Sequence, residues 1–276
     1  LTASARTAGG TPSMSERGET NIGPIQPVDE DETVDWLGNP VSCSDCPHEE
    51  TRAAGRCEFG RTCVNDRRGK RIDRFFAANQ AQADRYLDHP YFEVRTIAAK
   101  YASLFRLPAL MNDPEPDVRA MVALRLPKPR ILGFVVDPDR RVRMTVVRRL
   151  DGEDLVPLLS DADYGVRMAA ARRAPPALLV RVLRDEDAEI RREAARRVDE
   201  ALIGALIGDE DPTVRLIVAE RLKPERLHLM ADDKDFRVRF AVADRIPVGE
   251  LGRLVEDEDE LVRETARERL ARERGT

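Results

Sequence analysis

Residues 137–160 read DPDRRVRMTVVRRLDGEDLVPLLS, and this pattern recurs along the chain without insertions or deletions. Its clearest marker is the dipeptide Val142-Arg143, which returns every 24 residues, once as Ile-Arg. The eight copies are Val94-Arg95, Val118-Arg119, Val142-Arg143, Val166-Arg167, Ile190-Arg191, Val214-Arg215, Val238-Arg239 and Val262-Arg263. A fixed period of this length is typical of a solenoid, in which each unit buries its apolar face only against its neighbours.

The first half of each unit has the pattern of an α-helix. Asp139 stands where most units carry an acid, and in two units a proline follows that acid, as is typical of a helix N-cap and the first helical residue. After the cap, Val142, Val146 and Leu150 place apolar side chains at offsets 0, 4 and 8. Residues at this spacing share one helix face, so the pattern predicts an α-helix of about 12 residues in each unit.

The second half of each unit predicts a shorter helix. Leu155, Leu158 and Leu159 repeat the i, i+3, i+4 spacing, but only about eight residues remain before the next cap, which indicates one or two turns of 3₁₀-like helix. No unit shows the alternation of a β-strand. The array is therefore predicted to be an all-α solenoid, about 65–80 Å long if successive helices pack 8–10 Å apart.

Two rows of arginine need partners. Arg143 lies about 100° from Val142 on the helical wheel, within the packing face, where a charge must be paired. We expect it to pair with the acid six residues earlier, Asp137, within a unit or across to the neighbour, and so to fix the register of the units. A second row is expected to form solvated ion pairs, with a phosphate-binding row as the alternative. This second row consists of Arg125, Arg149, Arg173, Arg197, Arg221, Arg245 and Arg269.

All four cysteines lie in one short window with the spacing C-x2-C-x10-C-x5-C: Cys43, Cys46, Cys57 and Cys63. Four thiolates in a loop-rich segment form a complete ligand set for a soft metal ion or an iron–sulfur cluster. Zinc sites usually use two C-x2-C knuckles, so the C-x5-C pair favours a cluster, but zinc, disulfides and free thiols stay open.

Charged and titratable residues surround the cysteines in the sequence. His48 follows Cys46 by two residues; we expect it in a surface loop, with a ligand or a donor to sulfur as alternatives. Five arginines are near enough in sequence to compensate the negative charge of a thiolate-bound cluster, although they are equally expected to be solvated. They are Arg52, Arg56, Arg61, Arg67 and Arg68.

The composition limits the class of protein. The 276 residues are 42% hydrophobic and 35% charged with a net charge of −5, which is typical of a soluble protein and not of a polycation. No run approaches about 20 apolar residues and there is no secretory signal, so we expect a cytoplasmic protein without membrane contact, where structural disulfides are disfavoured.

The first 40 residues differ in composition from the rest. Residues 1–40 are poor in large apolar groups and carry the acidic run Asp29–Glu32, which predicts a disordered leader. Trp36 is the exception, and we expect it to be a simple packing anchor, with docking that shields the neighbouring module as the alternative. The sequence leaves open whether the native chain starts at Leu1 or at Met14.

The D-x-D-x-x-V-R core of the units, together with the four upstream cysteines, resembles the leucine-rich repeat variant family. The resemblance covers roughly 85% of the chain. It implies a right-handed superhelix that alternates α-helices with 3₁₀-helices, and an N-terminal [4Fe-4S] cluster ligated by the four cysteines, without an established enzyme activity. Residues 41–88 are then the module and an imperfect first repeat, with Lys70-Arg71 in place of Val-Arg, and residues 89–276 are eight repeats.

Two functions are consistent with these features. In the first, the protein binds an iron–sulfur cluster, is redox-active or redox-sensing, and uses its solenoid as a scaffold for a macromolecular partner, expected to be a protein. In the second, the four-cysteine site, filled by a cluster or by zinc, is only the structural cap of an interaction scaffold. A nucleic-acid-binding solenoid is a weaker third alternative, because the net charge is acidic. No motif has catalytic spacing, so we expect no catalytic residues and no enzyme activity. We also expect the protein to be a monomer.

Overall fold

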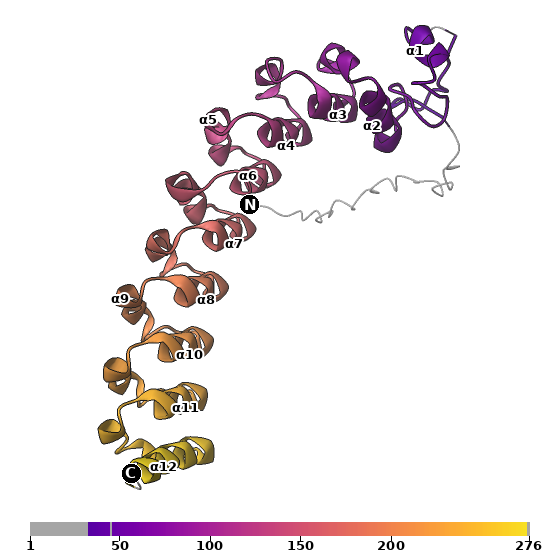
Figure 1. The fold of residues 1–276 in the computed structure, drawn as a ribbon. Helices are drawn as coiled ribbons and strands as arrows, with labels where there is room; N and C mark the ends of the chain where they lie inside the picture. The colour runs from indigo at the N-terminus through magenta and orange to yellow at the C-terminus, as the bar shows by residue number, and fades with distance from the viewer. Residues whose placement is uncertain (1–32, 45, 275–276) are drawn as a thin grey trace, which may run out of the picture.

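The computed structural model describes residues 33–44 and 46–274. Pairs of helices stack side by side into an open arc, with the longer α-helices along its inner side and short helical segments along its outer side (Figure 1). Within the described part no strand occurs, and only the isolated bridges Val34–Pro40 and Glu58–Thr62 are present, both ahead of the array. The predicted all-α solenoid is confirmed. None of the helices in residues 33–44 and 46–274 is long and apolar enough to cross a membrane.

The inner row contributes one α-helix to each 24-residue unit. Its members are α3 (Phe92–Tyr101), α4 (Pro116–Arg125), α6 (Arg140–Val147), α7 (Tyr164–Arg173), α8 (Ala188–Arg197), α10 (Pro212–Arg221), α11 (Phe236–Arg245) and α12 (Glu260–Arg274). The outer row consists of 3₁₀ segments (η) and two short α-helices: η2 (Leu107–Leu110), α5 (Lys128–Ile131), η3 (Leu132–Val136), η4 (Gly152–Ser160), η5 (Pro176–Val182), α9 (Glu200–Ile203), η6 (Gly204–Leu206), η7 (Pro224–Met230), η8 (Val248–Glu250) and η9 (Leu254–Glu256). Ahead of the array lie α1 (Glu49–Ala53), α2 (Gly69–Ala78) and η1 (Gln80–Tyr86).

The inner helices start as predicted but end earlier. Asp211 precedes α10 and its carboxylate accepts the backbone N–H groups of Thr213 and Val214 at 2.8 and 3.0 Å, which caps the helix. Most inner helices are ten residues long rather than about 12, because the apolar residue at offset 8 is extended. Leu126 has φ −66° and ψ 150°, and Pro127 follows it; a residue before proline is disfavoured in the α conformation.

The core is a continuous stripe through all units. In α10 and the residue after it, Val214, Val218, Ala219 and Leu222 are at most 1% exposed, which corresponds to offsets 0, 4, 5 and 8 of the predicted stripe. The leucines of the outer segments close the same core from the other side; Leu227, for example, is fully buried. Each unit therefore completes its core only against its neighbours, as a solenoid requires.

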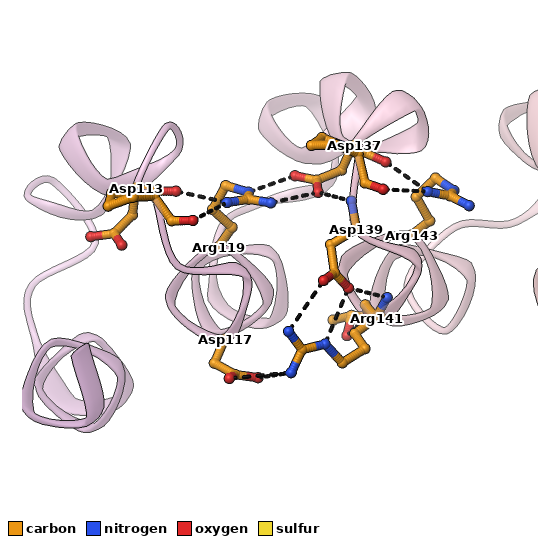
Figure 2. A network of polar contacts seen from close by, with 10 residues as sticks. Asp113, Asp117, Arg119, Asp137, Asp139, Arg141 and Arg143 are labelled. Atoms are coloured by element: carbon orange, nitrogen blue, oxygen red, sulfur yellow. Dashed lines mark hydrogen bonds and ion pairs between the residues drawn. The ribbon is translucent and has the colours of Figure 1, made fainter. Parts of the chain in front are cut away.

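The arginine after each valine links one unit to the next. Arg119 donates Nε and Nη2 to the two carboxylate oxygens of Asp137 in the following unit, at 2.8 and 2.9 Å (Figure 2). Its Nη1 donates to the backbone carbonyl of Asp113, six residues earlier, at 2.7 Å. The expected pairing across to the neighbour is confirmed, but the expectation that the carboxylate six residues earlier is the partner is wrong, because that residue contributes only its carbonyl oxygen.

The same fork recurs at every internal junction. The pairs are Arg95–Asp113, Arg119–Asp137, Arg143–Asp161, Arg167–Asp185, Arg191–Asp209, Arg215–Asp233 and Arg239–Asp257. Each aspartate also accepts the backbone N–H two residues on; in Asp137 this is the amide of Asp139, at 2.9 Å. We call this series the Arg–Asp ladder. It fixes the register between units, because a bidentate pair requires one defined geometry.

The second row of arginines has a different role from the one expected. Arg221 donates to the carbonyl oxygens of Ala195 and Val198, at the end of the preceding inner helix, at 2.5 and 2.8 Å. Every member of the row makes such a bond to the preceding unit. The row therefore satisfies carbonyl groups that a helix C-terminus leaves without partners, and this is its shared role; Arg197 in addition pairs with Glu193 at 3.1 Å.

Candidate metal centre

The segment that carries the cysteines is built from tight turns. Residues Glu58 and Thr62 pair through two backbone hydrogen bonds of 2.9 and 2.8 Å, and Gly60 turns the chain between them with φ 71°, which favours glycine. Cys57 and Cys63 flank this pair, so the turn brings the two ends of the C-x5-C spacing together. The Cys57 thiol donates to the carbonyl oxygen of Thr62 at 3.2 Å.

The four thiols lie close enough to influence one another. Burial, together with the charges of Cys63, Cys46 and Cys43, raises the pKa of Cys57 to about 11, while the charge of Arg52 opposes the rise. Burial also raises the pKa of Cys63, the most buried of the four. Each of the other three thiols therefore lies within electrostatic range of Cys57. None of them is paired in a disulfide.

Hydrogen-bond donors point at two of the sulfurs. The side-chain amide of Asn65 donates to Cys46 Sγ at 3.7 Å. The backbone N–H groups of Asn65 and Asp66 act on the Cys63 thiol and oppose the rise of its pKa, because they stabilise a thiolate. Hydrogen bonds to sulfur are among the features by which a protein tunes an iron–sulfur cluster. The all-sulfur donor set and these N–H groups therefore fit such a group.

The described side chains around the cysteines do not have the geometry of a single-ion site. Within residues 33–44 and 46–274, no group of three or more His, Cys, Asp or Glu side chains is arranged to hold one metal ion. Of the five arginines that the sequence places near the cysteines, Arg52 acts on the Cys57 thiol, whereas Arg61 pairs with Glu58 at 3.1 Å in an exposed ion pair.

An aromatic cluster lies beneath the cysteines. His48 is only 8% exposed, so the expectation of a surface loop is wrong. Its Nε2 hydrogen-bonds the Tyr86 hydroxyl, and its ring packs edge-on against Phe75 with centroids 4.8 Å apart. Burial, followed by the charge of Arg85, lowers the pKa of His48, so the imidazole is neutral at pH 7. Burial also raises the pKa of Tyr86 to about 12, and the charges of Cys46, Cys63 and Cys57 add to that rise.

The module is joined to the array through a modified first unit. Arg71 stands at the ladder position, but His89 occupies the place 18 residues later where an aspartate is needed. Arg71 instead turns back to Asp66, which is fully buried, at 2.7 Å. Asn79, at the end of α2, donates to the carbonyl oxygen of Arg56 at 2.8 Å. These contacts replace the ladder at the junction and connect the cysteine loop to the first repeat.

The end of the predicted leader takes part in this junction. Residues 1–32 lie outside the described residues, but the structure places residues 33–40, which the prediction also assigned to the leader. The Val34 side chain is 5% exposed and its carbonyl oxygen accepts the amide of Arg67 at 3.0 Å. Trp36 contacts His89 edge-on, with ring centroids 4.7 Å apart, and stacks on Tyr91 at 6.1 Å, so it packs on the start of the first full repeat.

Comparisons with known proteins agree with this arrangement. Residues 33–85 match the model of the family described as LRV protein FeS4 cluster. An uncharacterised 27.7 kDa protein in the nifB 3′ region of Rhodobacter capsulatus is 49% identical over 96 residues, which are 35% of this chain; the matched part spans only 39% of that relative. An engineered protein of solved structure is 18% identical with a TM-score of 0.32, over 75% of this chain and 71% of its own, which is too distant to carry an argument.

A solved structure is similar to this chain over most of its length. It is described as a leucine-rich repeat variant with a novel repetitive protein structural motif. It is 37% identical to this chain, with a TM-score of 0.71, over 83% of this chain and 99% of its own length. Together with the four-cysteine module that precedes the repeats, this likeness shows that the chain belongs to the leucine-rich repeat variant family with an N-terminal iron–sulfur module.

Proposed function

We propose that Cys43, Cys46, Cys57 and Cys63 ligate a [4Fe-4S] cluster, and that the protein is a redox-active or redox-sensing head on a solenoid scaffold for a macromolecular partner. The observation that carries the proposal is that the charges of all three other cysteines act on the half-buried thiol of Cys57. Four sulfurs around one region, with N–H donors aimed at two of them, match the one-sulfur-per-iron ligation of such a cluster.

The residues of this chain would hold and tune the group in distinct ways. The cluster itself supplies one-electron chemistry when bound. Cys57 and Cys63 are positioned by the Glu58–Thr62 turn, and the amide groups of Asn65 and Asp66 stabilise negative charge on the sulfurs. The aromatic cluster around Phe75 excludes water from one side, because Phe75 is fully buried.

Anaerobic purification with metal and sulfide analysis tests the proposed ligation. We expect about four iron and four sulfide per chain and a brown protein whose visible absorption bleaches on reduction. Cys57→Ser and Cys63→Ser should lose iron and sulfide together, whereas Ser44→Ala, in the same loop but without a proposed ligand, should retain both. Zinc without iron or sulfide would refute the proposed cluster.

A second function is favoured by one observation, the packing of the module on the first repeat. Cys57 packs against the hydrophobic core, and Ile72, Phe75 and Phe76 beneath the module are fully buried. In this version the site is a structural cap of the solenoid, which needs its terminal apolar face covered. Removing the metal should then lower the melting temperature strongly, while oxidation and reduction of the intact site should leave hydrogen exchange in α2 and α3 unchanged.

If the protein instead senses redox state, hydrogen exchange near the module should change when the site is oxidised or reduced. Tyr86 of η1 lies close enough to Cys46, Cys57 and Cys63 for their charges to raise its pKa, and its hydroxyl hydrogen-bonds His48. A change in the charge of the cluster should therefore act on the first repeat. We expect hydrogen exchange in η1 and α2 to differ between the oxidised and the reduced protein, with α11 and α12 as an internal reference far along the arc (Figure 1).

A further inference from the structure

The inner face of the arc carries an apolar groove near its C-terminal end. The groove has a volume of about 380 Å³ and lies over α10, α11 and the start of α12. Leu216, Phe236, Phe240 and Leu261 line its apolar part, and the last three are 43%, 42% and 56% exposed. Two half-exposed phenylalanines and a leucine side by side form a patch of the kind that marks an interaction site.

The packing of the repeats does not require these side chains. In α11 the core is complete without them, since Val238, Val242 and Ala243 are fully buried. Phe240 stands at offset 2 of its unit, where other units have Ala120 or Arg192. The aromatic side chain at this position is therefore specific to the unit of Phe240 and is not a requirement of the repeat.

The rim of the groove is acidic. Glu220 and Asp244 line it, and Glu264 continues the row of Leu216 and Phe240 in the next unit. None of these three carboxylates forms an ion pair within the part of the chain that the structure describes. They are therefore available to a ligand of opposite charge.

The two arginines of the groove are already engaged. Arg237 pairs with Asp235 at 2.6 Å. Arg245 donates to the carbonyl oxygens of Ala219 and Leu222 at the end of α10. Arg245 keeps its positive charge, but the three carboxylates of Glu220, Asp244 and Glu264 outnumber it, so the net charge beside the groove is negative. The middle of the same face differs, because Arg148 and Arg172 are exposed there.

We propose that this groove binds a cationic amphipathic helix of a partner protein. Leu216 and Phe240 are one unit apart, about 8–10 Å, and this matches the i to i+7 separation of about 10 Å along a helix. A helix laid along the arc would place its apolar stripe on Leu216, Phe240 and Leu261 and its lysines or arginines beside Glu220, Asp244 and Glu264. The inference rests on the proposed role of the array as a partner scaffold, and it names the chemistry of the partner.

Binding of defined peptides to the full-length chain tests the proposal. The probe is a fluorescein-labelled 18-residue peptide with leucines at i, i+3, i+4 and i+7 and lysines elsewhere. One comparison peptide replaces every lysine by glutamate, and another has the same composition without the stripe. Fluorescence anisotropy should show 1:1 binding of the first peptide that weakens with salt, and much weaker binding of the other two.

Matched variants locate the binding. Phe240→Ser should weaken binding at least about tenfold, because an exposed aromatic anchor is lost. Asp244→Asn should weaken it less and reduce its salt dependence. Phe105→Ser removes a phenylalanine that is 95% exposed between α3 and η2, outside the groove, and should change nothing. Thermal unfolding checks that Phe240→Ser, an exposed position, leaves the fold intact.

Several outcomes would overturn the inference. The first is that the glutamate peptide or the stripe-free peptide binds as tightly as the lysine peptide. The second is that Phe240→Ser binds the lysine peptide with unchanged affinity. The third is a dimer in analytical ultracentrifugation that Phe240→Ser converts to a monomer, because a second copy of the chain would then cover the groove. Iron and sulfide are measured on the same samples. Peptide binding without iron refutes the cluster but not the groove, and iron without peptide binding refutes the groove but not the cluster.

Discussion

At the scale of single residues, the Arg–Asp ladder explains why an arginine recurs on the packing face at seven successive unit junctions. Arg191 is 5% exposed, yet its guanidinium has both oxygens of Asp209 and the carbonyl of Asp185 as partners, the nearest at 2.7 Å. A buried charge is tolerated only with such complete pairing. The ladder is therefore a registration device for the units more than a source of net stability, because desolvation offsets much of the attraction.

Replacing a ladder arginine by leucine should destabilise the array strongly. Arg191→Leu leaves the buried carboxylate of Asp209 without its partner, and we expect a loss of about 3 kcal/mol in the free energy of unfolding, measured by urea denaturation. Arg141→Leu is the matched control. Arg141 also pairs with an aspartate, Asp139, but its side chain is 55% exposed and it is not part of the ladder. A loss in Arg191→Leu no larger than in Arg141→Leu would contradict the role of the ladder.

The stability of the array should fall in acid. The hydrogen bond from Arg239 holds the pKa of Asp257 below its ordinary value, and the bond from Arg237 lowers the pKa of Asp235 to about 2. Because the pKa of each is lower in the folded than in the unfolded state, their contribution is present above about pH 4 and is lost as the pH falls towards 2.

Acid titration of melting temperature checks this window. Asp257→Asn should lower the melting temperature at pH 7 and flatten its decline between about pH 4 and pH 2. A variant whose acid decline has the same slope as that of the unaltered chain would show that the Arg239–Asp257 pair does not contribute to it.

At the scale of elements, the caps set where each inner helix begins. Asp211 accepts two N–H groups of α10, whereas Glu115 stands at the same position before α4 and makes no side-chain cap. Asp211→Ala should therefore cost about 1 kcal/mol of stability, and Glu115→Ala should cost much less, as measured by denaturant unfolding. Equal losses in the two variants would mean that the acid column acts by charge alone.

The helices could be predicted from the sequence, but the partners of their arginines could not. Val142, Val146 and Leu150 are spaced so that they share one face of an α-helix, and this spacing therefore predicts the helix. The acids at −6 and +18 from Arg143 belong to the same column of a 24-residue repeat, so periodicity cannot distinguish Asp137 from Asp161. Every residue has a backbone carbonyl, so the sequence does not show which carbonyl accepts a side-chain hydrogen bond. The bond from Arg221 to the carbonyl oxygen of Ala195 could therefore not be predicted.

The module shows a different limit. The spacing of the cysteines predicts a ligand set, because four thiols at such short intervals are typical of a metal or cluster site. The module has no internal repeat, so nothing in the sequence aligns His48 with Tyr86, which lies 38 residues away. The burial of His48 follows from its packing on Phe75, which is distant in the sequence, and only the structure shows this contact.

At the scale of the whole molecule, the protein is an arc with a cysteine module at one end and an apolar groove near the other (Figure 1). Each unit contacts mainly its neighbours, so the scaffold is assembled from local interfaces along one direction. The module interrupts this regularity, since Arg71 turns back to Asp66 instead of continuing the ladder. The end that carries the cysteines is therefore a distinct unit built onto the repeat.

The most direct test of the central claim is a crystal structure from anaerobically purified protein, with anomalous data on both sides of the iron and zinc edges. We predict anomalous density at the iron edge between the sulfurs of Cys43, Cys46, Cys57 and Cys63, with one sulfur bound to each iron. A single peak at the zinc edge among the four sulfurs, without signal at the iron edge, would contradict the account.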